Sequence, residues 1–169
     1  MQATLPISIC EVQGPNGAVA YVTLAPADEV AKRGLVTQEI IGQLIDASRA
    51  GQDFEPDNFA RNRVFVEFLH SVIEKHGPTV PDLVAAASTQ VSGWVYVIDG
   101  RTPTPHGPVL PEDIVGGFQV EEGEIVAGSY SANPNHRILS HNGFFQLEAS
   151  LQQRLLDELA VYAQEMPAD

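Results

Sequence analysis

The sequence has a single cysteine, Cys10, among its 169 residues. An intrachain disulfide and a zinc site built from cysteines are therefore both excluded. Cys10 lies in an apolar run between Ile9 and Glu11, without the basic neighbours that make a thiol reactive. We expect it to be an inert thiol of the core.

Basic residues are scarce as well. The chain has 9 Lys and Arg against 22 Asp and Glu, which gives a formal net charge of -13. Nucleic acids and anionic membranes are bound through basic side chains, so neither is expected as a partner. A basic protein or a cation would be attracted, although an acidic surface also serves simply to keep a protein soluble.

Long apolar runs are missing too. No run approaches the ~18 residues of a membrane span, and no basic start is followed by the apolar stretch of a secretion signal. We therefore expect a cytoplasmic protein. The apolar fraction of 44% and the length suit one folded unit, and we expect residues 1–169 to form a single globular domain.

Residues that favour β-strands gather near the two ends of the chain. Two such runs flank the turn sequence from Gly14 to Gly17, which predicts an N-terminal hairpin. Further strands are expected near 94–98, 114–120 and 124–127. Trp94 to Ile98 has no polar alternation, which predicts a central strand buried on both faces.

The middle and the end of the chain are expected to be helical. The spacing of Ile40, Ile41, Leu44 and Ile45 predicts a helix near 37–50. Similar apolar stripes predict helices near 57–76 and 148–164, and shorter helices are expected after Pro26 and Pro81. The predicted fold class is therefore α+β, an antiparallel sheet packed by helices.

The stretch that follows the strand at 94–98 is the first candidate for a site. Asp99 leads into a loop that four prolines make stiff, and a stiff loop loses less entropy when a partner binds it. Loops mounted on a rigid sheet often carry functional groups. The simpler interpretation is that Asp99 and Gly100 only form a turn.

A second candidate is a set of histidines and acids. If the 99–113 and 133–141 loops converge, they would form a cleft whose weak catalytic candidates are Asp99, His106, Asp113 and His136. The weak metal-ligand candidates are His106, His136 and His141. Their spacing matches no compact metal motif, and ordinary loop histidines are the simpler explanation.

No cofactor is expected, because the sequence has neither a G-x-S-x-G nor a nucleotide-binding glycine motif. The aromatic residues form either core or a partner-binding patch. The candidate binding residues are Trp94, Arg101, His106, Asn135 and Phe144.

Three functions remain open on the sequence. The leading hypothesis is a non-enzymatic cytoplasmic accessory or interaction protein, which contacts a protein partner of basic character through the acidic, proline-stiffened loop. The second is a small metal-assisted hydrolase with the cleft described above. The third is a homodimeric structural protein with an apolar patch around the aromatic residues.

Overall fold

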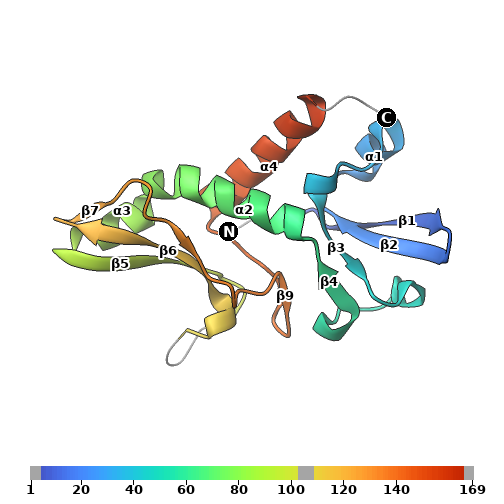
Figure 1. Cartoon of the computed structure of the whole chain (residues 1–169), viewed down its shortest axis with the longest axis horizontal. Coiled ribbons are helices and arrows are strands. Elements are labelled where there is room, and N and C mark those ends of the chain that lie inside the picture. Colours follow the sequence, from blue (N-terminus) through green and yellow to red (C-terminus); the bar gives the residue numbers. More distant parts are fainter. Residues whose placement is uncertain (1–4, 103–108, 166–169) are drawn as a thin grey trace.

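A computed structural model describes residues 5–102 and 109–165, which form two four-stranded antiparallel sheets joined by helices and a further two-stranded hairpin. The sheets lie at opposite ends of the molecule, and helices α2 (Arg63–His76) and α4 (Ala149–Glu165) lie between them (Figure 1). The predicted α+β class is confirmed. The strands expected in one sheet are divided between two four-stranded sheets.

The N-terminal sheet has the strand order β1-β2-β3-β4. Its first two strands form the predicted hairpin, and Gly17 takes a φ of 115° at the turn, where glycine is favoured. The short helix α1 (Ala27–Arg33) follows, as expected after Pro26, and Gly34 caps its end. The strand bounds are β1 Ser8–Gly14, β2 Gly17–Thr23, β3 Ile40–Leu44 and β4 Phe59–Arg61.

The helix predicted near 37–50 is wrong. Residues Ile40–Leu44 form strand β3, flanked by the short 3-10 helices Thr37–Glu39 and Ala47–Arg49. Gly42 explains the error, because a Cβ there would lie 2.4 Å from the ring of Phe59 on the neighbouring strand. Pairing with both β2 and β4 outweighs a local apolar spacing that suits a helix.

Helix α2 ends at His76, as predicted, but it begins at Arg63 and not near residue 57. Asn62 caps it, since its side chain accepts a hydrogen bond from the amide of Val64. The same side chain donates to the carbonyls of Thr37 and Ile40, which ties the start of the helix to the N-terminal sheet.

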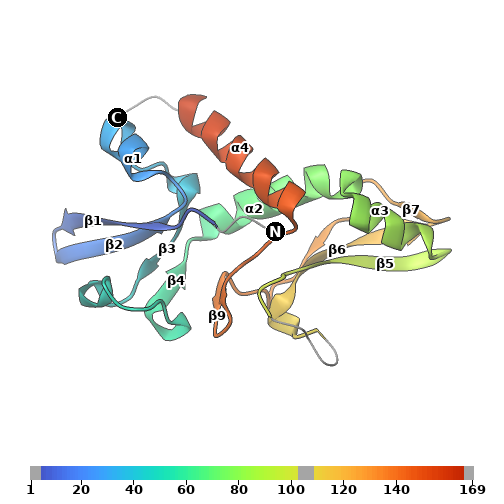
Figure 2. The same ribbon diagram turned by 180° about the vertical axis from the view of Figure 1, so that it is seen from behind.

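The C-terminal sheet has the order β5-β6-β7, and β8 also pairs with β6. Strand β5 is therefore an edge strand, which corrects the expected central position. Its residues alternate between exposed and buried, and α3 (Pro81–Ser88) packs on the buried side (Figure 2). The bounds are β5 Ser92–Ile98, β6 Ile114–Glu121, β7 Glu124–Ile125 and β8 Ser131–Ala132.

A short hairpin leads from the C-terminal sheet to α4. It consists of β9 (Leu139–Ser140) and β10 (Gly143–Phe144), and the helix predicted near 148–164 is confirmed as α4. Three further 3-10 helices complete the described elements: Pro56–Asn58, Gly77–Thr79 and Pro111–Asp113.

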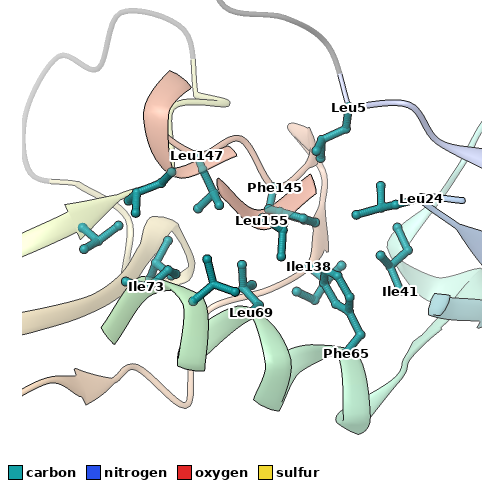
Figure 3. Packing of buried hydrophobic residues seen from close by; sticks show 14 of the residues in the cluster. Leu5, Leu24, Ile41, Phe65, Leu69, Ile73, Ile138, Phe145, Leu147 and Leu155 are labelled. Atoms are coloured by element: carbon teal, nitrogen blue, oxygen red, sulfur yellow. The ribbon is translucent and has the colours of Figure 1, made fainter. Parts of the chain in front are cut away.

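One hydrophobic cluster connects both sheets with the helices (Figure 3). Phe65, Leu69 and Ile73 contribute one face of α2, and each is fully buried. Burying a side chain of this size stabilises the fold by roughly 1.5–3 kcal/mol. Among residues 5–102 and 109–165, no helix has the length and apolar character needed to cross a membrane.

Candidate functional site

A buried network of charged groups lies where β5 ends. Asp99 accepts hydrogen bonds from the backbone amides of Arg101 and Gln146, at 3.1 and 2.9 Å. Its other oxygen lies 2.9 Å from Nε2 of His136. The two loops expected to form a cleft therefore do converge at Asp99 and His136.

Arg101 is the centre of this network. Its Nε donates to Asp113 at 2.8 Å, and its terminal nitrogens donate to backbone carbonyls of three separate segments. Thr102 binds the second carboxylate oxygen of Asp113. The side chains of Asp99, Arg101, Asp113 and His136 are all nearly inaccessible to solvent. A planar guanidinium with five donors suits such a junction, which holds the loops in one arrangement.

The donors and acceptors of this network bind one another. The guanidinium of Arg101 lies within 3.7 Å of both carboxylates and supplies the positive charge that a metal would otherwise bring. Across the described ranges, no group of three or more His, Cys, Asp or Glu side chains is placed to hold a metal ion. The arrangement has the character of a structural clamp.

The other candidate residues are dispersed. His106 lies outside the described residues. His141 is exposed, and Asn135 is exposed beside a polar depression that also includes Arg61 and Arg137. Phe144 packs edge-on against Phe54 and Phe59, with ring centroids 4.8 and 5.7 Å away, and so connects the last hairpin to the N-terminal sheet.

A groove next to the network holds the last candidate, Trp94. Trp94 and Tyr96 lie on the same side of β5, here called the outer face, and are 42% and 51% exposed. Val95 and Val97 point to the opposite, inner face and are buried. The groove has a volume of about 420 Å³ and mainly apolar walls, and we call it the aromatic groove. Its lining residues are Trp94, Tyr96, Pro111, Ile114, Gly116, Gly117, Ser131, Ala132, Asn133 and Pro134.

Two glycines make the floor of the aromatic groove thin. A Cβ on Gly117 would lie 3.0 Å from the ring of Tyr96, which lies across it on the outer face. A Cβ on Gly116 would lie 2.4 Å from the hydroxyl of Tyr130 on the inner face. Each tyrosine therefore packs where a side chain of β6 would otherwise stand.

Tyr130 is fixed from behind by a histidine of α2. Its hydroxyl lies 2.7 Å from Nδ1 of His70, and its ring packs 5.0 Å from that of Phe118. Burial lowers the pKa of His70 to about 4, and the nearby charges of His136 and Arg61 act in the same direction. Burial also raises the pKa of Tyr130. Both groups are therefore neutral at pH 7, as a partly buried pair requires.

Acidic residues border one end of the outer face. Ser92 is opposite Glu121 on β6, which in turn is opposite Glu124 on β7, and all three are exposed. Directly opposite residues of an antiparallel pair share a face. The outer face is thus acidic at one end and apolar where Ile114, Pro111 and Pro134 lie.

Sequence reasoning identified Trp94 but did not identify the groove around it. Every residue from Trp94 to Ile98 favours a strand and none is charged. The sequence therefore shows no polar–apolar alternation that would distinguish the exposed face from the buried one. Gly116 and Gly117 carried a signal, because paired glycines in a strand indicate the close approach of another group.

Comparisons with known proteins identify no relative. No protein-family model, no curated protein and no solved structure matches this chain.

Proposed function

We propose that this protein is a non-enzymatic interaction module that binds an extended segment of another protein in the aromatic groove. The observation that carries the proposal is the exposed pair Trp94 and Tyr96 above a floor of glycine. Aromatic side chains that are exposed next to an apolar depression supply much of the energy of protein interfaces. The groove is open along the sheet, which suits a segment of chain better than an enclosed small molecule.

The acidic residues of the outer face favour a basic partner. Glu121 and Glu124 lie outside the groove, on the same outer face beyond Trp94, and the chain as a whole carries a net charge of -13. A segment with apolar residues over Tyr96 and Ile114, and with Lys or Arg near the two acids, matches this surface. The proposal keeps the basic protein partner expected from the sequence and moves the contact to the sheet beside the proline-rich loop.

The buried clamp supports this function and argues against the hydrolase. Asp99, Asp113 and His136 each bind a group of the protein itself, and Arg101 neutralises the carboxylates. A general base has to reach a substrate proton, whereas these side chains are enclosed.

With Cys10 as its single cysteine, the fold needs no disulfide, which suits a reducing compartment such as the cytoplasm.

The test is a selection from a random peptide display library on the immobilised protein. We expect enrichment of peptides that combine apolar and basic residues, and loss of their binding in Trp94→Ala. The double variant Glu121→Gln/Glu124→Gln should weaken binding. The matched control Glu11→Gln/Asp28→Asn removes the same charge from exposed positions of the N-terminal half and should bind like the wild type. Enriched peptides that bind Trp94→Ala unchanged would disprove the proposal.

A further inference from the structure

Strand β5 leaves one side of its backbone unpaired. It pairs with β6 along one edge, and along the other it pairs with no described strand. In both views it forms the rim of the C-terminal sheet (Figures 1 and 2). An edge of this kind presents amide and carbonyl groups to which another strand can bind.

The hydrogen bonds of the sheet show which groups point outward. Gln119, the partner of Trp94 in the register, directs its amide to Ser129 and its carbonyl to Val126, away from β5. Trp94 is therefore in a non-hydrogen-bonded pair, and its own amide and carbonyl point to the open edge. The register is regular as far as Val97, so the amide and carbonyl of Tyr96 also point to the open edge.

A side chain of the protein itself already binds this edge. Nε2 of Gln90 donates to the carbonyl of Trp94 at 3.1 Å. This amide group takes the position that the backbone amide of an added strand would occupy. The edge is thus capable of accepting a hydrogen bond in the orientation that strand addition requires.

The sequence of β5 lacks the usual protection of an edge. The strand SGWVYVI contains no charged residue and no proline, and its irregularity lies at its end, between Val97 and Ile98. Three other edge strands carry a charged residue: Glu11 in β1, Arg61 in β4 and Glu124 in β7. Uncharged edges rich in β-formers associate with other chains unless a specific partner covers them.

We infer that two copies of this chain pair through their β5 strands, antiparallel about Val95, into one continuous sheet. The register makes the strand complementary to itself. Trp94 of each copy lies opposite Tyr96 of the other in a hydrogen-bonded pair, and each such pair exchanges two backbone hydrogen bonds. Val95 faces its own equivalent on the two-fold axis, as in an isologous interface.

The distribution of charge favours this arrangement of the two copies. The acids Glu121 and Glu124 lie at the Ser92 end of the sheet. An antiparallel pairing brings that end next to the Ile98 end of the second copy, so the two acidic rows lie at opposite ends of the joined sheet. A parallel pairing would place them side by side, where like charges repel.

The pairing also completes the outer face. Trp94 and Tyr96 of both copies would form a continuous row of aromatic rings, so the second copy contributes residues to the groove. Cross-strand aromatic pairs of this kind stabilise a sheet. The inference does not depend on the peptide partner proposed above, since its experiments measure association of the protein with itself.

Light scattering coupled to size-exclusion chromatography gives the first test. At concentrations on the order of 100 μM, where a dimer with a micromolar Kd is populated, we expect twice the chain mass of 18.2 kDa. Tyr96→Pro should be a monomer, because proline removes an outward amide that the described fold does not use. The matched variant Tyr96→Thr loses the ring but keeps the amide, so it should still dimerise at this concentration, more weakly than the wild type. A monomeric wild type, or a Tyr96→Pro variant that stays dimeric, would overturn the inference.

A disulfide test fixes the register and does not rely on the proline variant folding. In a Cys10→Ser background, Val95→Cys should form an intermolecular disulfide under mild oxidation, since the two Cα atoms would face each other in a non-hydrogen-bonded pair about 4.5 Å apart. Val97→Cys is the control, because Val97 would face Gly93 of the second copy. Equal crosslinking of the two variants, or none in either, would exclude this register.

Discussion

Nε of Arg101 lies 2.8 Å from Oδ1 of Asp113, and both side chains are only 2% exposed. The pair joins the end of β5 to the start of β6 from within the protein. Buried ion pairs are not necessarily stabilising compared with an apolar pair, but removing one member leaves the other charged and unpaired. The clamp is therefore the most sensitive point of the loops that border the aromatic groove.

We predict that Arg101→Met lowers the free energy of unfolding by about 3–5 kcal/mol, because Asp113 and several carbonyls lose their donors. Urea denaturation measures the change. Arg137→Met is the control, since the side chain of Arg137 is 58% exposed and makes a long contact of 3.5 Å with Glu112. Exposed ion pairs of this kind contribute about 0–1 kcal/mol. Equal losses in the two variants would contradict the clamp.

We predict that Gly116→Ala lowers stability by about 1–3 kcal/mol, since the new methyl group overlaps the hydroxyl of Tyr130. Gly51→Ala serves as control, because a Cβ at that position meets nothing within 4 Å. Thermal unfolding of both variants compares them. The double variant Gly116→Ala/Tyr130→Val should recover part of the loss, and additive effects would show that the two positions do not interact.

Stability should fall between about pH 6.5 and pH 4, in part because of His70. The folded state holds the pKa of His70 at about 4, whereas an unfolded chain gives it the ordinary value near 6.5. The unfolded state therefore binds a proton first as the pH falls, and the contribution of the neutral histidine is complete above about pH 6.5 and lost by about pH 4.

The variant His70→Gln isolates this contribution, because glutamine can still bind the hydroxyl of Tyr130 and does not titrate. Denaturant unfolding of the wild type and of His70→Gln at several pH values gives the comparison. The difference in stability between the two should change with pH in this window. A constant difference would mean that His70 is not held neutral by the fold.

Salt should affect the two proposed associations in opposite directions. A basic peptide is attracted by Glu121 and Glu124, so added salt should weaken its binding. Two copies that each carry -13 repel one another at a distance, so salt should strengthen the dimer. The fluorescence anisotropy of a labelled peptide reports the first equilibrium, and sedimentation reports the second. A dimer that dissociates as salt rises would indicate an interface held by ion pairs and not by β5.

Local signals in the sequence predicted most elements of the fold. The turn from Gly14 to Gly17, the helix start after Pro26 and the apolar stripe of α2 each depend on neighbouring residues, and the structure confirms them. Strand β3 was mistaken for a helix because its identity depends on pairing with β2 and β4, which are distant in sequence or separated by a loop. Periodicity cannot reveal a partner strand.

The candidate site was predictable to a similar extent. Asp99 and His136 were expected to meet only if two loops converged, and they do lie together, but the central position of Arg101 was not foreseen. Its role depends on carbonyls of three segments, and backbone carbonyls leave no trace in a sequence. The edge position of β5 was missed for the same reason as β3, since strand order is a property of the whole chain.

The paired glycines of β6 place two tyrosines on opposite sides of a single layer of backbone. Tyr130 packs against this layer from the interior, and Tyr96 packs against it from the solvent side. With no side chain to absorb a displacement, a shift of Tyr130 or of His70 behind it moves the floor on which Tyr96 rests. If the proposed segment binds in the aromatic groove, substitutions in the interior should therefore change which segments bind there without altering a residue that the partner touches.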